Sequence, residues 1–170
     1  MQRPIGSPAK VALWSVALML ALPACMERKE FPVEPRIEFR SMEVFADSLS
    51  LTISFTDGDG DIGLDATDNA PPFDSGSPWH NNLFVEYHQL VAGEWTQPAL
   101  LIPLHYRIPR LSPSGRDKAL EGEVAVGMAW PVFPMPPGSP ADTVRFTVQL
   151  ADRALHLSNV VETGVLLVAH

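Results

Sequence analysis

The chain has 170 residues with 12 Lys or Arg, 20 Asp or Glu, and a formal net charge of −8. That length suits one domain with short extensions. The negative charge would repel the phosphates of nucleic acids, which excludes nucleic acid as an expected partner. It also argues against an electrostatic hold on anionic lipid.

The first 25 residues, MQRPIGSPAKVALWSVALMLALPAC, have the layout of a secretory signal. Arg3 and Lys10 form a positively charged region, and residues 11–22 form an apolar run. A membrane-spanning helix needs about 20 apolar residues, and this run is shorter. We therefore expect export of the chain rather than a spanning helix.

The end of this run, LPAC at residues 22–25, resembles the lipobox of bacterial lipoproteins, which are cleaved before the cysteine and acylated on it. Cys25 is the only cysteine, so an internal disulfide is excluded. The resemblance implies a signal peptide over residues 1–24 and a lipid on Cys25 that anchors the protein in the cell envelope. We expect the outer membrane, facing the periplasm or the exterior. The alternative is an ordinary signal peptide, or an uncleaved anchor, with an incidental cysteine.

Cleavage after residue 24 would remove Arg3 and Lys10 and change the formal charge from −8 to −10. Residues 25–35 then form a short charged tether that contains two prolines. Residues 36–170 remain for one domain, which is long enough to bury a core without disulfides.

Alternation of apolar and polar residues dominates this domain. In SLSLTISFT (48–56) every second residue is apolar and the others are Ser or Thr, which predicts a half-buried β-strand. NLFVEYHQLV (82–91) and the stretch that ends in TQPALLIPL (96–104) predict a hairpin around Gly93. Further strands are expected at 37–44, 119–126, 143–152 and 160–169.

No segment after the tether shows sustained helical periodicity, and the chain has 17 prolines, several of them clustered at 130–140. Proline disfavours helix interiors and central strands. About seven short strands separated by turn residues predict an all-β fold, a single immunoglobulin-like antiparallel β-sandwich. A small barrel is the alternative architecture.

The stretch SFTDGDGDIGL (54–64) follows the clearest strand and alternates aspartate with glycine. Gly58, Gly60 and Gly63 satisfy the pattern G-x-G-x-x-G, but a dinucleotide site needs that pattern to open a helix. The residues that follow, LDATDNAPPFDSGSP, cannot form a regular helix. The aspartates would also repel phosphate, so we exclude a nucleotide as partner.

Calcium is a better match for this loop. Asp57, Asp59 and Asp61 occupy the first three ligand positions of an EF-hand, and Asp65 and Asp68 fall at its ninth and twelfth. The EF-hand itself is excluded, because the required glycine comes one place late and a strand precedes the loop. Carboxylates at i, i+2 and i+4 can still converge on one Ca²⁺, so we predict a metal site at the first three aspartates, with the other two as further ligands. A solvated turn is the alternative, because Asp-Gly pairs are turn formers.

A later aspartate could complete this site. LADRALHLSNVVET (150–163) joins the last two predicted strands and resembles the Asp-containing hairpin of bacterial immunoglobulin-like domains. In such a sandwich the loop after the second strand and the loop before the last strand lie at one end, which predicts Asp152 near Asp57–Asp61. The alternative roles of Asp152 are a salt bridge with Arg153 and a capping turn.

Together, the LPAC box, the DGDGDIG loop and the DRALHLSN hairpin resemble a group of Bacteroidetes-type exported lipoproteins with an immunoglobulin-like domain. The resemblance covers most of the chain after the signal. Members of that group are mostly uncharacterised, so the resemblance implies a location and a fold, and not an activity.

Motifs of common enzymes are missing from the sequence. It contains neither H-E-x-x-H nor G-x-S-x-G, and its five histidines lack metal-ligand spacing. We therefore expect a structural or binding protein rather than an enzyme, with a hydrolase built on spatially paired carboxylates as the weaker alternative. The main rival is a glycan- or protein-binding module of a cell-surface uptake system. It would need an exposed aromatic patch at Trp79 or Trp130, whereas a loop anchor packed on the core is the other role for Trp79.

Overall fold

The structure, a computed structural model, describes residues 30–111, 118–129 and 141–169. The predicted signal peptide, Cys25 and Trp130 lie outside these ranges. Within them the chain forms nine strands and no helix, and therefore no helix that is long and apolar enough to cross a membrane. The strands are β1 (Arg36–Val44), β2 (Ser48–Asp57), β3 (Leu83–Val91), β4 (Glu94–Thr96), β5 (Leu104–Tyr106), β6 (Leu120–Ala129), β7 (Ala141–Leu150), β8 (Val161–Glu162) and β9 (Leu166–Ala169).

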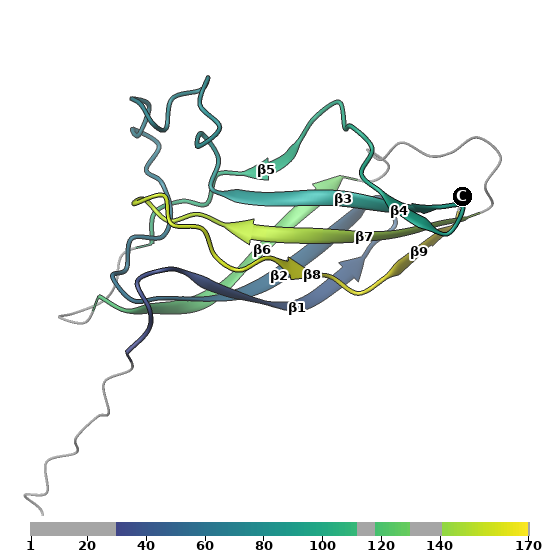
Figure 1. Cartoon of the computed structure of the whole chain (residues 1–170), viewed down its shortest axis with the longest axis horizontal. Helices are drawn as coiled ribbons and strands as arrows, with labels where there is room; N and C mark the ends of the chain where they lie inside the picture. Colours follow the sequence, from purple (N-terminus) through teal and green to yellow (C-terminus); the bar gives the residue numbers. More distant parts are fainter. Residues whose placement is uncertain (1–29, 112–117, 130–140, 170) are drawn as a thin grey trace, which may run out of the picture.

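The strands form two antiparallel sheets that lie against each other (Figure 1). The first sheet has the order β1–β2–β6. The second has the order β4–β3–β7–β8, with β5 pairing to β3 and β9 pairing to β7. This arrangement confirms the predicted all-β antiparallel sandwich and is consistent with an immunoglobulin-like fold.

The core lies between the two sheets and follows from the alternation in the strands. In β2, Leu49, Leu51 and Ile53 have no exposed surface, whereas the serines and threonines between them are half-buried. Phe146 and Val148 of β7 are buried to the same degree in the opposite sheet. A shift of one residue in the pairing of β2 would turn all these apolar side chains outward, so the register is strongly specified.

Two segments differ from the predicted strands. The hairpin around Gly93 forms, with positive φ at Ala92 and Gly93, but its return strand β4 has only three residues. Residues 97–103 leave the sheet, because their two prolines lack the N–H that a ladder needs, and β5 then resumes the pairing with β3. The predicted last strand is divided into β8 and β9 by residues 163–165. The described residues therefore form nine strands where about seven were predicted, within the same architecture.

We predict that Ile53→Ala lowers the free energy of unfolding by about 2–5 kcal/mol, because it leaves a cavity in the fully buried centre of β2. Ser50→Ala, on the outer face of the same strand, should change it by less than about 0.5 kcal/mol. Urea unfolding followed by circular dichroism measures both. Equal effects of the two substitutions would contradict the sidedness of β2.

Candidate metal site

Asp57 is the last residue of β2 and has no exposed surface. Its side chain points inward because it continues the alternation of the apolar residues before it. Its Oδ2 accepts a hydrogen bond of 2.9 Å from the backbone N–H of Asp61, which closes the loop on itself. Its Oδ1 is buried and has no hydrogen-bond partner among the described residues. A buried carboxylate oxygen without a partner is costly, so this atom calls for a ligand.

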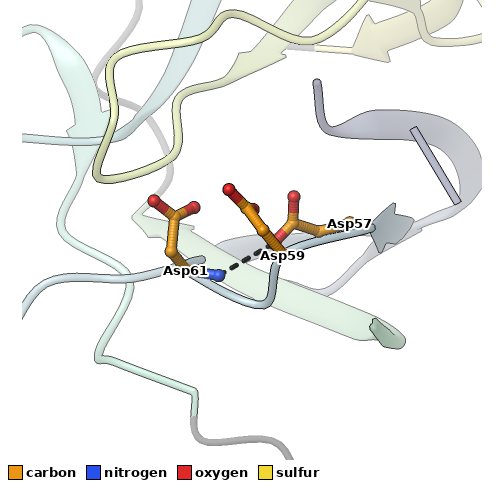
Figure 2. A group of neighbouring side chains, drawn as sticks. All are labelled: Asp57, Asp59 and Asp61. Atoms are coloured by element: carbon orange, nitrogen blue, oxygen red, sulfur yellow. Dashed lines mark hydrogen bonds between the residues drawn. The ribbon is translucent and has the colours of Figure 1, made fainter. Parts of the chain in front are cut away.

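Asp59 and Asp61 bring two more carboxylates to the same place. One oxygen from each of the three aspartates lies within 4.8 Å of the others. Figure 2 shows the three side chains next to one another, with their carboxylates pointing to the same side of the loop. Within the described part of the chain, Oδ1 of Asp59 and Oδ1 of Asp61 are also buried without a hydrogen-bond partner. Two oxygens on opposite sides of a Ca²⁺ ion lie about 5 Å apart, so all three aspartates can touch one such ion.

The electrostatics of the three carboxylates favour a cation. Burial raises the pKa of Asp57 from 3.8 to about 6, against the lowering effect of the hydrogen bond from Asp61 and with the charges of Asp59, Asp61 and Asp152 adding to the rise. Burial, followed by the charges of Asp152 and Asp59, also raises the pKa of Asp61. At neutral pH Asp57 is still mainly ionised. In the residues that the structure describes, no ion pair joins these three carboxylates to a basic side chain.

Asp152 lies next to this cluster, as the strand count predicts. It follows β7, is 1% exposed, and forms an isolated antiparallel bridge with Ile62, while the N–H of Arg153 donates to the carbonyl oxygen of Asp61 at 3.3 Å. Its own carboxylate accepts hydrogen bonds from the backbone N–H and the ring Nδ1 of His156, at 2.8 and 2.9 Å. The second of these bonds raises the pKa of His156. Asp152 therefore caps its hairpin and adds negative charge beside the cluster, with both oxygens already occupied by His156.

Asp65 and Asp68 face arginines instead of the cluster. Asp68 forms an ion pair with Arg153, and that hydrogen bond lowers the pKa of Asp68. Asp65 pairs with Arg110 at 3.0 Å, and the guanidinium of Arg107 donates to the carbonyl oxygens of both aspartates, at 3.0 and 2.7 Å. These three arginines come from distant parts of the sequence, and no local pattern links them to the aspartates. They hold the long loop after β2 to the rest of the sandwich.

Trp79 is half-buried in that long loop. Its ring packs edge-on against Phe84 of β3, with the ring centroids 6.2 Å apart, and Phe84 packs in turn against His105. The contact matches the role of a loop anchor. On the same sheet, Trp95 lies beneath the guanidinium of Arg145, at 4.4 Å.

A shallow groove of about 350 Å³ lies on the outer face of the first sheet and contains Glu38, Glu121 and Glu123. The side chains of Glu38 and Glu123 are 73% and 63% exposed, and both lie near Arg40, at 3.4 and 3.9 Å. The groove is therefore an open surface on which two exposed glutamates lie close to one arginine.

Comparison of the chain with protein-family models, curated proteins and solved structures found no match.

The raised pKa of Asp57 predicts a measurable pH dependence in the presence of a chelator. The folded state favours the protonated carboxyl, so this contribution to stability is complete below pH 3.8 and is lost as the pH rises to about 6. The free energy of unfolding, taken as wild type minus Asp57→Asn, should fall by about 3 kcal/mol across that window. Urea unfolding at a series of pH values measures it. A difference that rises with pH would contradict the buried, uncompensated state of this carboxylate.

Proposed function

We propose that this protein is a lipid-anchored extracytoplasmic β-sandwich in which a Ca²⁺ ion bound by Asp57, Asp59 and Asp61 fastens one end of the fold. The observation that carries the metal is the carboxylate of Asp57, which is fully buried and has one oxygen without a partner. Two further carboxylates within 4.8 Å supply the remaining charge. The role of the whole protein would be structural or ligand-binding on the cell envelope.

The ligand chemistry favours calcium over softer metals. The three nearest groups are carboxylates, and hard cations prefer oxygen ligands. Ca²⁺ takes 6–8 oxygens in a flexible arrangement, which suits a loop that can also offer backbone carbonyls. Mg²⁺ demands a stricter octahedron and is the natural competitor to test.

The position of the site suggests what the ion would do. Asp57 ends β2 of the first sheet, and Asp61 is bonded to the hairpin that follows β7 of the second sheet. An ion between these aspartates would hold the ends of both sheets together. Because it would bind the folded state only, it would stabilise the fold by mass action.

We predict that saturating Ca²⁺ raises the melting temperature of the chain from Met26 onward, which contains every described residue. At a concentration about 100 times Kd the gain is about 2.7 kcal/mol, or roughly 5–10 °C for a domain of this size. Extracellular calcium modules often have Kd values of about 10⁻⁴ to 10⁻³ M, so the titration should extend to tens of millimolar. Differential scanning calorimetry with added Ca²⁺, Mg²⁺ or chelator measures the shift.

Asp59→Asn should abolish most of the shift, because it removes one of the three negative charges that hold the ion while leaving the side-chain volume unchanged. Asp47→Asn is the matched control, since Asp47 lies exposed before β2, at the end of that strand remote from Asp57. It should keep the full response to Ca²⁺. No shift in the wild-type protein, or the same shift in both variants, would reject the calcium site.

The anchor has its own test. Cys25→Ser should abolish incorporation of a labelled fatty acid and should release the protein from the membrane fraction of a bacterial host, because the acyl chains are the only expected membrane contact. Labelling with an alkyne-tagged fatty acid, followed by fractionation, measures both. An unlabelled wild-type chain would leave an ordinary signal peptide as the better interpretation of residues 1–24.

The rival role in glycan or protein binding has less support. Part of the Trp79 ring packs against Phe84, and Trp130 lies outside the described residues. The observation that would favour this role is a soluble glycan or protein whose binding weakens in Trp79→Ala while the melting temperature stays unchanged.

A further inference from the structure

The chain just before β1 lies directly on the aspartate loop. We call residues 31–35, which precede the strand, the leading segment. The N–H of Gly58 donates to the carbonyl oxygen of Pro32 at 2.8 Å. A Cβ atom on Gly58 would lie 2.3 Å from the carbonyl oxygen of Phe31 and 2.6 Å from that of Pro32. Only glycine permits so close an approach of two backbones, so the contact depends on the residue between Asp57 and Asp59.

The chain after Pro32 makes further contacts with the domain. Pro35 is buried, although it belongs to the stretch predicted to be a tether. The side-chain amide of Asn159 accepts from the N–H of Ile37 and donates to its carbonyl oxygen, at 3.0 and 2.9 Å. The leading segment thus rests on the aspartate loop at Gly58, and the start of β1 that follows it is bonded to the end of the hairpin after β7. In Figure 2 the chain before β1 and this hairpin lie on the side to which the carboxylates point.

The carbonyl oxygen of Phe31 accepts no hydrogen bond within the described part of the chain. It is a neutral oxygen that lies against the backbone of Gly58, the residue between Asp57 and Asp59. Ca²⁺ sites commonly combine carboxylates with backbone carbonyls, because neutral ligands raise the coordination number without adding negative charge. Phe31 therefore offers what the aspartate cluster lacks.

We propose that the cation bound by Asp57, Asp59 and Asp61 also takes the carbonyl oxygen of Phe31 as a ligand and thereby locks the leading segment onto the domain. The inference rests on the proposed calcium site. Without the cation the three carboxylates repel one another, and the segment keeps only the hydrogen bond from Gly58 and its packing. The ion would then control where the ordered domain begins.

The lock would change how far the domain can move from its proposed lipid anchor. Six residue steps separate Cys25 from Phe31, which span at most about 20 Å when fully extended. Release of the leading segment would move the first fixed residue to Arg36 and extend that reach to about 36–40 Å. Calcium would therefore hold the sandwich closer to the membrane and limit its orientations.

Hydrogen exchange tests the lock directly. The full-length chain in mild detergent is exchanged with Ca²⁺ or with chelator, and peptides covering residues 31–36 are followed by mass spectrometry. We expect exchange of the amides of Val33 and Glu34 to slow about tenfold or more on addition of Ca²⁺ in the wild type and to stay unchanged in Asp59→Asn. A peptide from the centre of β3 serves as the internal reference for global stability.

Substitution of Gly58 tests whether the leading segment contributes a ligand to the bound Ca²⁺. Gly58→Ala should displace the leading segment without touching a carboxylate, and it should weaken Ca²⁺ binding about tenfold in isothermal titration calorimetry. Gly164→Ala is the matched control, since a Cβ there meets nothing within 4 Å. It should leave Kd unchanged. If Gly58→Ala does not fold, the exchange of residues 31–36 in the wild type decides.

The outcomes distinguish the two proposals. Normal Ca²⁺ binding with unchanged exchange at residues 31–36 would overturn the lock and leave the calcium site in place. An unchanged Kd in a folded Gly58→Ala variant would remove Phe31 from the ligands. Absence of Ca²⁺ binding to the wild-type chain would overturn the calcium site and the lock together.

Discussion

The structure of this end of the sandwich depends on the burial of one carboxylate, that of Asp57. The register that turns Leu49, Leu51, Ile53 and Phe55 of β2 into the core turns Asp57 inward as well, because side chains alternate strictly along a strand. The strand cannot expose the aspartate without exposing its apolar residues. The surrounding structure must therefore compensate a buried negative charge.

Asp152 is a second buried carboxylate at this end of the sandwich, and its hydrogen-bond donors come from the chain itself. It continues the inward face of β7 after Val148 and Leu150, and it is as deeply buried as Asp57. Its two oxygens each accept a hydrogen bond, from the backbone and from the ring of His156, so no oxygen of Asp152 is left without a partner. Asp57 receives one such bond and has two more carboxylates as neighbours. The contrast between two equivalent strand ends is the reason why the proposed cation is assigned to the cluster around Asp57 and not to Asp152.

Much of this arrangement follows from the sequence. Alternation is a local signal, and it located the core strands and the turn at Gly93. The strand count correctly placed Asp152 beside the aspartate loop, because both loops lie at the same end of a sandwich. The ion pairs of Asp65 and Asp68 could not be predicted, since Arg110 and Arg153 reach them from 45 and 85 residues away. The contact of Pro32 with Gly58 was equally hidden, because a charged, proline-containing stretch is typical of a tether.

The arginines at this end of the sandwich pair with the second half of the stretch from Asp57 to Asp68. Arg153 follows Asp152 directly and lies near enough for the charge of Asp61 to contribute to the rise in its pKa, but its ion pair and hydrogen bond with Asp68 are the larger cause. That pairing fastens the long loop with groups of the chain itself, and the arginine in it is always charged. A cation held by aspartates is different, since its hold depends on its concentration outside the protein. Within the described residues, arginines thus hold the second half of the stretch from Asp57 to Asp68, whereas the first half is held by backbone hydrogen bonds at Gly58 and Asp61 without an ion pair. In the proposed calcium site, the bound ion would supply the positive charge that this first half does not receive from the chain.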